Sequence, residues 1–103
     1  MHAELQVEFT KFVDDSFPGF VQCEFSDALG KRHAIVDKVP VLTLAELGPE
    51  STYPQPGTVT CEIVSRYQSD AGNDLANITI SRPNSLETVD GITEFVVSSS
   101  ILC

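Results

Sequence analysis

The chain has 103 residues, with 15 Asp and Glu against 6 Lys and Arg, so its formal net charge at pH 7 is -9. One domain spanning residues 1–103 is expected, because a chain of this length builds one hydrophobic core. The acidic excess argues against nucleic acid and anionic membranes as partners, since phosphate binders need clustered cations. With 42% hydrophobic residues, the composition is that of a folded domain and not of an acidic tail.

The first residues carry neither a basic leader nor a long apolar run, which predicts a cytoplasmic protein without a membrane span. Three cysteines, Cys23, Cys61 and Cys103, form an odd set without C-x-x-C spacing. They match neither a disulfide framework nor a zinc site. We therefore expect reduced thiols, two of them acting as small apolar residues of the core.

Apolar and polar residues alternate through the first part of the chain, which predicts strands with one buried face. Residues 5–10 form the first strand, and the turn formers of 14–19 end it. Residues 21–38 read as a hairpin in which Gly30 completes a type I turn followed by a Gly bulge. Pro40 lacks an amide proton and restricts the chain to a sheet edge, a bulge or a bend.

The middle of the chain is predicted to be irregular. Residues 43–48 have the capping-box spacing of Thr and Glu and a terminal Gly, so one helical turn is expected, with a tight turn as the alternative. Residues 48–57 carry three prolines and two glycines and form the longest loop. Because binding residues concentrate on loops, Tyr53, Glu46 and Glu50 are the candidate binding residues. In the alternative interpretation, Tyr53 closes one end of a barrel.

The second half of the chain again alternates. Strands are predicted over 58–67, 75–81 and 92–99, while 86–91 is either a short edge strand or a loop. Six or seven short strands predict an all-β fold, a small closed or nearly closed antiparallel barrel, with a sandwich as the second choice. Within 58–67, one face carries Val59, Cys61 and Ile63, and the other carries Thr58, Thr60 and Glu62.

Residues for catalysis are scarce. His33 is the one histidine that a catalytic pair could use, because His2 is poorly held near the terminus. Asp37 shares a strand face with His33 but lies too far along it for a close pair, so a solvated histidine beside the hairpin is preferred. Residues 70–74 resemble a calcium loop but lack its glutamate and its flanking helices. The sequence therefore predicts no catalytic residues, no metal and no cofactor.

The stretch from Val39-Pro40-Val41-Leu42 to Gly57-Thr58-Val59 and the strand that follows it resembles the second, β-barrel domain of elongation-factor-type translational GTPases. The resemblance covers only part of the chain, and Cys61-Glu62 stand where such barrels tend to have a glycine. It implies a six-stranded barrel that binds partners and has no catalysis of its own. It assigns no role to any single residue.

Three functions remain open, and an enzyme is the least favoured. The first is a non-enzymatic protein–protein interaction module whose acidic surface binds a basic partner, as bacterial immunity proteins do with basic toxins. The second is a small-molecule-binding barrel with residues 45–57 at its mouth. The third is a hydrolase that uses His33. A homodimer through the edge near Pro40 is compatible with all three, and solubility alone would also explain the charge.

Overall fold

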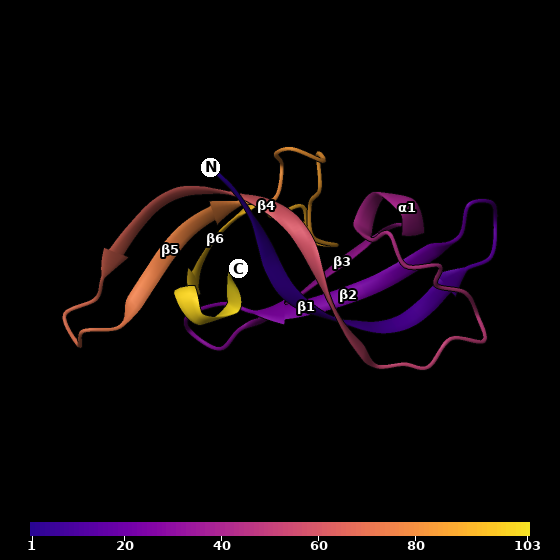
Figure 1. The fold of residues 1–103 in the computed structure, drawn as a ribbon, viewed down its shortest axis with the longest axis horizontal. Helices are drawn as coiled ribbons and strands as arrows, with labels where there is room; N and C mark the ends of the chain where they lie inside the picture. Colours follow the sequence, from indigo (N-terminus) through magenta and orange to yellow (C-terminus); the bar gives the residue numbers. More distant parts are fainter.

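The computed structural model describes all residues, 1–103. It contains six strands, one short α-helix and one 3-10 helix (Figure 1). No helix is long and apolar enough to cross a membrane. In chain order the elements are β1 His2–Asp14, β2 Phe20–Ser26, β3 Arg32–Lys38, α1 Val39–Leu42, β4 Gln55–Gln68, β5 Asp74–Thr79, β6 Glu94–Ser98 and the 3-10 helix Ser99–Ile101.

All six strands form one antiparallel sheet in the order β3-β2-β1-β4-β5-β6. Two three-stranded meanders, β1 to β3 and β4 to β6, therefore lie side by side and meet where β1 pairs with β4. The sheet curls strongly into a half-barrel, and β3 and β6 remain its edges. The all-β prediction with six antiparallel strands is confirmed. The sandwich is wrong, because there is a single sheet, and the sheet is open rather than closed.

The two edges of the half-barrel approach each other without forming a ladder. The backbone N–H of Ala28, in the β2–β3 turn, donates to the carbonyl of Val96 in β6 at 2.8 Å. In the opposite direction, the N–H of Val89, in the β5–β6 connection, donates to the carbonyl of Ala34 in β3 at 2.9 Å. Each meander thus binds the edge strand of the other through the tip of a turn.

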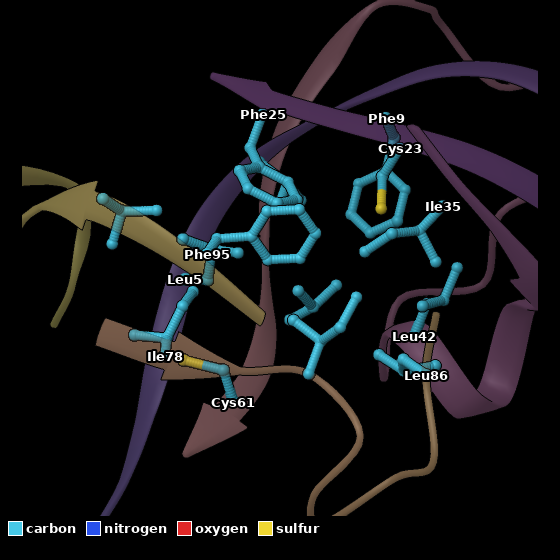
Figure 2. Close-up of a cluster of buried hydrophobic side chains, with 14 of the residues drawn as sticks. Leu5, Phe9, Cys23, Phe25, Ile35, Leu42, Cys61, Ile78, Leu86 and Phe95 are labelled. Atoms are coloured by element: carbon cyan, nitrogen blue, oxygen red, sulfur yellow. The ribbon is translucent and has the colours of Figure 1, made fainter. Parts of the chain in front are cut away.

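The core lies on the concave face of the sheet and comprises one cluster of 18 buried residues. The two-residue period explains its composition, since successive side chains of a strand point to opposite faces. Leu5 of β1 and Cys61 of β4 are fully buried in this cluster, and the rings of Phe25 and Phe95 pack edge to face at 5.1 Å (Figure 2). Leu86 adds a side chain from the β5–β6 connection.

Three turns share one hydrogen-bonding pattern, a type I turn followed by a glycine bulge. In the β2–β3 turn, the N–H of Gly30 donates to the backbone carbonyl of Asp27, and the N–H of Asp27 donates to the backbone carbonyl of Lys31. Gly30 has φ +83, a left-handed conformation that glycine adopts without steric cost. The prediction for this hairpin is confirmed. The turns at 69–73 and 88–92 repeat the pattern, with glycine at the equivalent position.

The helical turn expected over 43–48 is wrong in position, since the one helical turn is α1, four residues earlier. Pro40 lies in the first turn of α1, where its missing N–H costs no hydrogen bond. A sheet edge, a bulge or a bend was expected for this proline, and all three are wrong, because the chain forms a helical turn there. Thr43 is extended, with φ -155, and its hydroxyl accepts from the N–H of Ala45 to close a local turn. Residues 86–91 form a loop, not a strand.

Candidate binding site

A cavity of about 780 Å3 opens beside β4 and is the candidate site. Residues 40–45, which comprise most of α1 and the chain after it, form one wall. Glu4 of β1 and Thr58 and Thr60 of β4 form the opposite side, and Asn84 adds the end of a loop. The volume lies in the range of ordinary ligand sites. The cavity combines an apolar wall with a small number of polar groups.

Glu4 is the one charged residue that lines this cavity. It lies directly opposite Thr60 in the β1–β4 ladder, and Thr58 lies on the same face two residues earlier. The Thr58 hydroxyl donates to one carboxylate oxygen of Glu4 at 3.1 Å, and the Thr60 hydroxyl donates to the other at 2.8 Å. No Lys or Arg forms an ion pair with Glu4. Because each carboxylate oxygen accepts about two hydrogen bonds, capacity for a further donor remains.

Along this cavity the backbone of β4 is paired with β1 on one side only, and its other side has no neighbouring strand. Glu4 exchanges both of its backbone hydrogen bonds with Cys103, at 3.1 and 3.0 Å, so its N–H and carbonyl point away from β4. In an antiparallel ladder, the residue opposite such a position also points its own N–H and carbonyl away from the partner strand. Thr60 therefore directs its backbone groups away from β1, and Thr58, two residues earlier, does the same.

No strand covers these groups, because β5 begins to pair with β4 only at Glu62. After Thr79 the chain leaves β4, and Ile80 donates its N–H to Thr93 instead. Figure 1 shows β5 beside one half of β4, with α1 and the loop after β5 near the other half. The N–H and carbonyl groups of Thr58 and Thr60 thus form a free sheet edge that lines the cavity.

The residues predicted as binding contacts lie elsewhere. Tyr53 is half-buried, packs against the core cluster, and donates its hydroxyl to the carbonyl of Gly48 at 2.8 Å, so it holds the loop closed. Glu46 and Glu50 are exposed and line a separate depression that also includes Ser51. None of these three residues lines the cavity of Glu4.

The alternation of β4 placed Thr58 and Thr60 correctly on the face opposite the core, but the sequence did not single them out. Glu4 was likewise missed as a candidate. The signal in the sequence was a lone carboxylate on the polar face of one strand and two threonines spaced by two on another. Only the register of β1 against β4 brings them together, since Glu4 and Thr58 are 54 positions apart along the chain.

His33 is buried, so the expectation of a solvated side chain is wrong. Its ring packs against Phe25 and Phe95, with centroid distances of 5.5 and 4.6 Å, and its Nε2 lies 2.8 Å from Asp27 Oδ2. The pKa of Asp27 is lowered, above all by this hydrogen bond. Asp37 is not the partner, since its carboxylate accepts from the N–H of Lys38.

The three thiols are free. Cys23 and Cys61 are buried in the core, and burial is the main cause that raises their pKa values to about 12 and about 11. Cys103 is exposed. No group of three or more His, Cys, Asp or Glu is placed to hold a metal ion.

Comparison with known proteins supplies no relative. No protein-family model, no curated protein and no solved structure matches the chain. The class of protein is therefore set by the structure alone, as a small all-β half-barrel with a cavity beside a free strand edge. Function has to be argued from the chemistry of that site.

Proposed function

We propose that the protein is a non-enzymatic interaction module that binds a basic protein partner. The cavity beside β4 carries this proposal, because its one charged residue, Glu4, lacks an ion-pair partner. Its surroundings add to the negative field. Residues 39–65 contain no Lys, Arg or His and three glutamates, of which Glu46 and Glu50 take part in no ion pair. A surface of one sign attracts the opposite charge and speeds association.

The ion pairs within the protein leave most of the negative charge uncompensated. Arg32 pairs with Glu8 and Glu24, and Arg82 pairs with Glu62. Eleven of the 15 carboxylates take part in no ion pair. Immunity proteins, which neutralise basic toxins, serve as an analogy for such a charge balance. The resemblance to the barrel domain of translational GTPases also favours a partner-binding role, and a cytoplasmic location remains part of the proposal.

The test has two stages. The immobilised chain is exposed to extract of its native cells at low salt, and each retained protein is then produced alone and titrated by calorimetry in rising salt. We expect a partner with an excess of Lys and Arg whose affinity falls steadily between 20 and about 300 mM salt, as screening of surface charges requires. Retention of acidic proteins only, or an affinity indifferent to salt, would contradict the proposal and leave solubility as the role of the charge.

Small-molecule binding is the second candidate, favoured by the size of the cavity and by its apolar wall of Pro40, Val41, Leu42, Leu44 and Ala45. A thermal-shift screen tests it, because a ligand that binds the folded state raises Tm. We expect small cationic amphiphiles to raise Tm. If no class of compound raises Tm, the result counts against this candidate. A hydrolase is not proposed, since His33 has Asp27 as its one hydrogen-bond partner and does not line the cavity.

A further inference from the structure

We propose that the cavity is a strand-addition site, in which an extended basic segment of the partner pairs with the free edge of β4 and places a Lys or Arg side chain on Glu4. This inference rests on the proposed function and specifies how the partner is recognised. Strand addition is a common mode of peptide recognition, in which backbone hydrogen bonds supply affinity and side-chain pockets supply specificity.

The backbone part of the site consists of the N–H and carbonyl groups of Thr58 and Thr60. Both residues direct these groups away from β1, and β5 covers neither of them. They lie two residues apart, which is the repeat at which one strand hydrogen-bonds to the next in an antiparallel ladder. An added strand can therefore continue the sheet at this point without displacing any existing pair.

The specific part of the site is Glu4. The hydroxyls of Thr58 and Thr60 hold both carboxylate oxygens in place, so the acceptor is oriented before a ligand arrives. A guanidinium or ammonium group on a segment beside β4 needs to reach across one strand only to meet it. Charge-assisted hydrogen bonds of this kind are stronger than neutral ones.

The apolar wall suits the remainder of a basic side chain. Lys and Arg bury their methylene stems against apolar surface while the charged end reaches a polar partner. Pro40, Val41 and Leu44 provide such surface opposite Glu4, and Leu44 is fully exposed. A neutral apolar peptide would offer Glu4 no charged partner, and an acidic peptide would be repelled by it.

A second copy of this chain is a poor occupant. Each copy carries -9, so two copies repel each other. Pro56, which precedes Thr58 by two residues, faces the same edge without an N–H to donate, and such prolines discourage pairing between sheet edges. A single extended basic segment is attracted by this charge and needs to pair only with Thr58 and Thr60, which both have an N–H to donate.

The experiment uses the full chain and a fluorescein-labelled hexapeptide of alternating valine and threonine with one central arginine. Two further peptides replace the arginine by citrulline, its neutral isostere, or by glutamate, and a fourth carries N-methyl groups on alternate backbone amides. Binding is followed by fluorescence anisotropy at low salt. Glu4→Gln is the test variant, because glutamine keeps the shape of the side chain and can still hydrogen-bond to both threonines, accepting from one hydroxyl through its oxygen and donating to the other through its amide nitrogen. Glu94→Gln is the matched control, since it removes the same charge from an exposed residue of β6 outside the cavity.

We expect the arginine peptide to bind and the citrulline and N-methyl peptides to bind at least about tenfold more weakly, a factor equivalent to about 1.4 kcal/mol. Glu4→Gln should produce a loss similar to that of citrulline, and the two losses should not add, whereas Glu94→Gln should change little. The amide resonances of Thr58 and Thr60 should shift on binding and become protected from exchange.

Several results would overturn the strand-addition site. Equal losses in Glu4→Gln and Glu94→Gln would show a general field effect, and equal binding of the N-methyl peptide would exclude backbone pairing. If a basic partner is captured from extract but no arginine peptide binds, the proposed function stands and this site is wrong. A chain that dimerises alone, and becomes monomeric in Thr58→Pro, would show that the occupant is a second copy.

Discussion

Gly57 precedes the free edge of β4, and a single methyl group added there tests the packing of the half-barrel. A Cβ built on Gly57 would meet the ring of Phe9, with Cδ2 at 2.8 Å and Cε2 still closer. Phe9 is buried at 2% exposure, so its ring has little room to withdraw. Crowding of a packed core costs about 1–3 kcal/mol, and we expect Gly57→Ala to lower the free energy of unfolding by that amount. Each kcal/mol corresponds to a fall of about 4–8 °C in Tm for a domain of this size.

Gly48→Ala is the matched control for this measurement. Gly48 lies in a loop, has nothing within 4 Å of its added Cβ, and does not need a left-handed backbone. Its replacement should leave stability unchanged or raise it by up to about 1 kcal/mol, through the lower entropy of the unfolded chain. Urea denaturation of both variants, read by circular dichroism, gives the two changes in the free energy of unfolding.

A double variant separates the clash from other effects of the methyl group. Phe9→Leu shortens the side chain that Gly57 faces, so Gly57→Ala should cost less in that background than in the native one, with a coupling of about 0.5–3 kcal/mol. If Gly57→Ala is as stable as Gly48→Ala, or if its cost is unchanged beside Phe9→Leu, the close approach of the ring does not limit this position and the reasoning fails.

Three further predictions concern the pH, the thiols and the β5–β6 connection. The lowered pKa of Asp27 stabilises the fold above the carboxyl's ordinary pKa, near 3.8, and this contribution is lost as the pH falls through the lower pKa of the folded state. The Tm difference between the native chain and Asp27→Asn should therefore shrink from pH 6 to pH 3, and a constant difference would contradict it. Iodoacetamide at pH 8 should modify Cys103 alone in the folded protein and all three thiols in urea, as counted by mass spectrometry, because Cys23 and Cys61 are buried. Rapid modification of three thiols without denaturant would be inconsistent with the core. Leu86→Ala should destabilise by about 2–5 kcal/mol in urea denaturation, since Leu86 is a fully buried side chain, and a loss below 1 kcal/mol would mean that the loop is not part of the core.

The strands could be predicted from the sequence because a half-barrel with one buried face imposes a two-residue period on every strand. The turn at Gly30 could be predicted for a different reason, because its positive φ favours glycine. The predictions that were wrong depend on contacts between residues that no local sequence pattern contains. His33 is buried because Asp27, in the preceding turn, folds back onto its ring, and the hydrogen bond compensates for burial of a polar group.

The misplaced helical turn has a related cause. Thr43 and Glu46 have the spacing of a capping box, yet the Thr43 hydroxyl is used by a local turn, and the chain coils earlier, beside Pro40. Glu4 illustrates the limit for the candidate site. Its carboxylate is one of 15 in the chain, and only the pairing of β1 with β4 distinguishes it from the others.

The arrangement of the sheet as two meanders has a consequence for how the chain folds. Within each meander, neighbouring strands are joined by short connections or, for β5 and β6, by a single loop, so these pairs can form early. The junction of β1 with β4 joins residues that are distant in the sequence, such as Glu4 and Thr60, which are 56 positions apart along the chain. Because loop-closure entropy has to be overcome before such distant contacts form, we expect this junction to set the folding rate. Substitutions that weaken it would slow folding, whereas those confined to β3 or β6 would mainly speed unfolding.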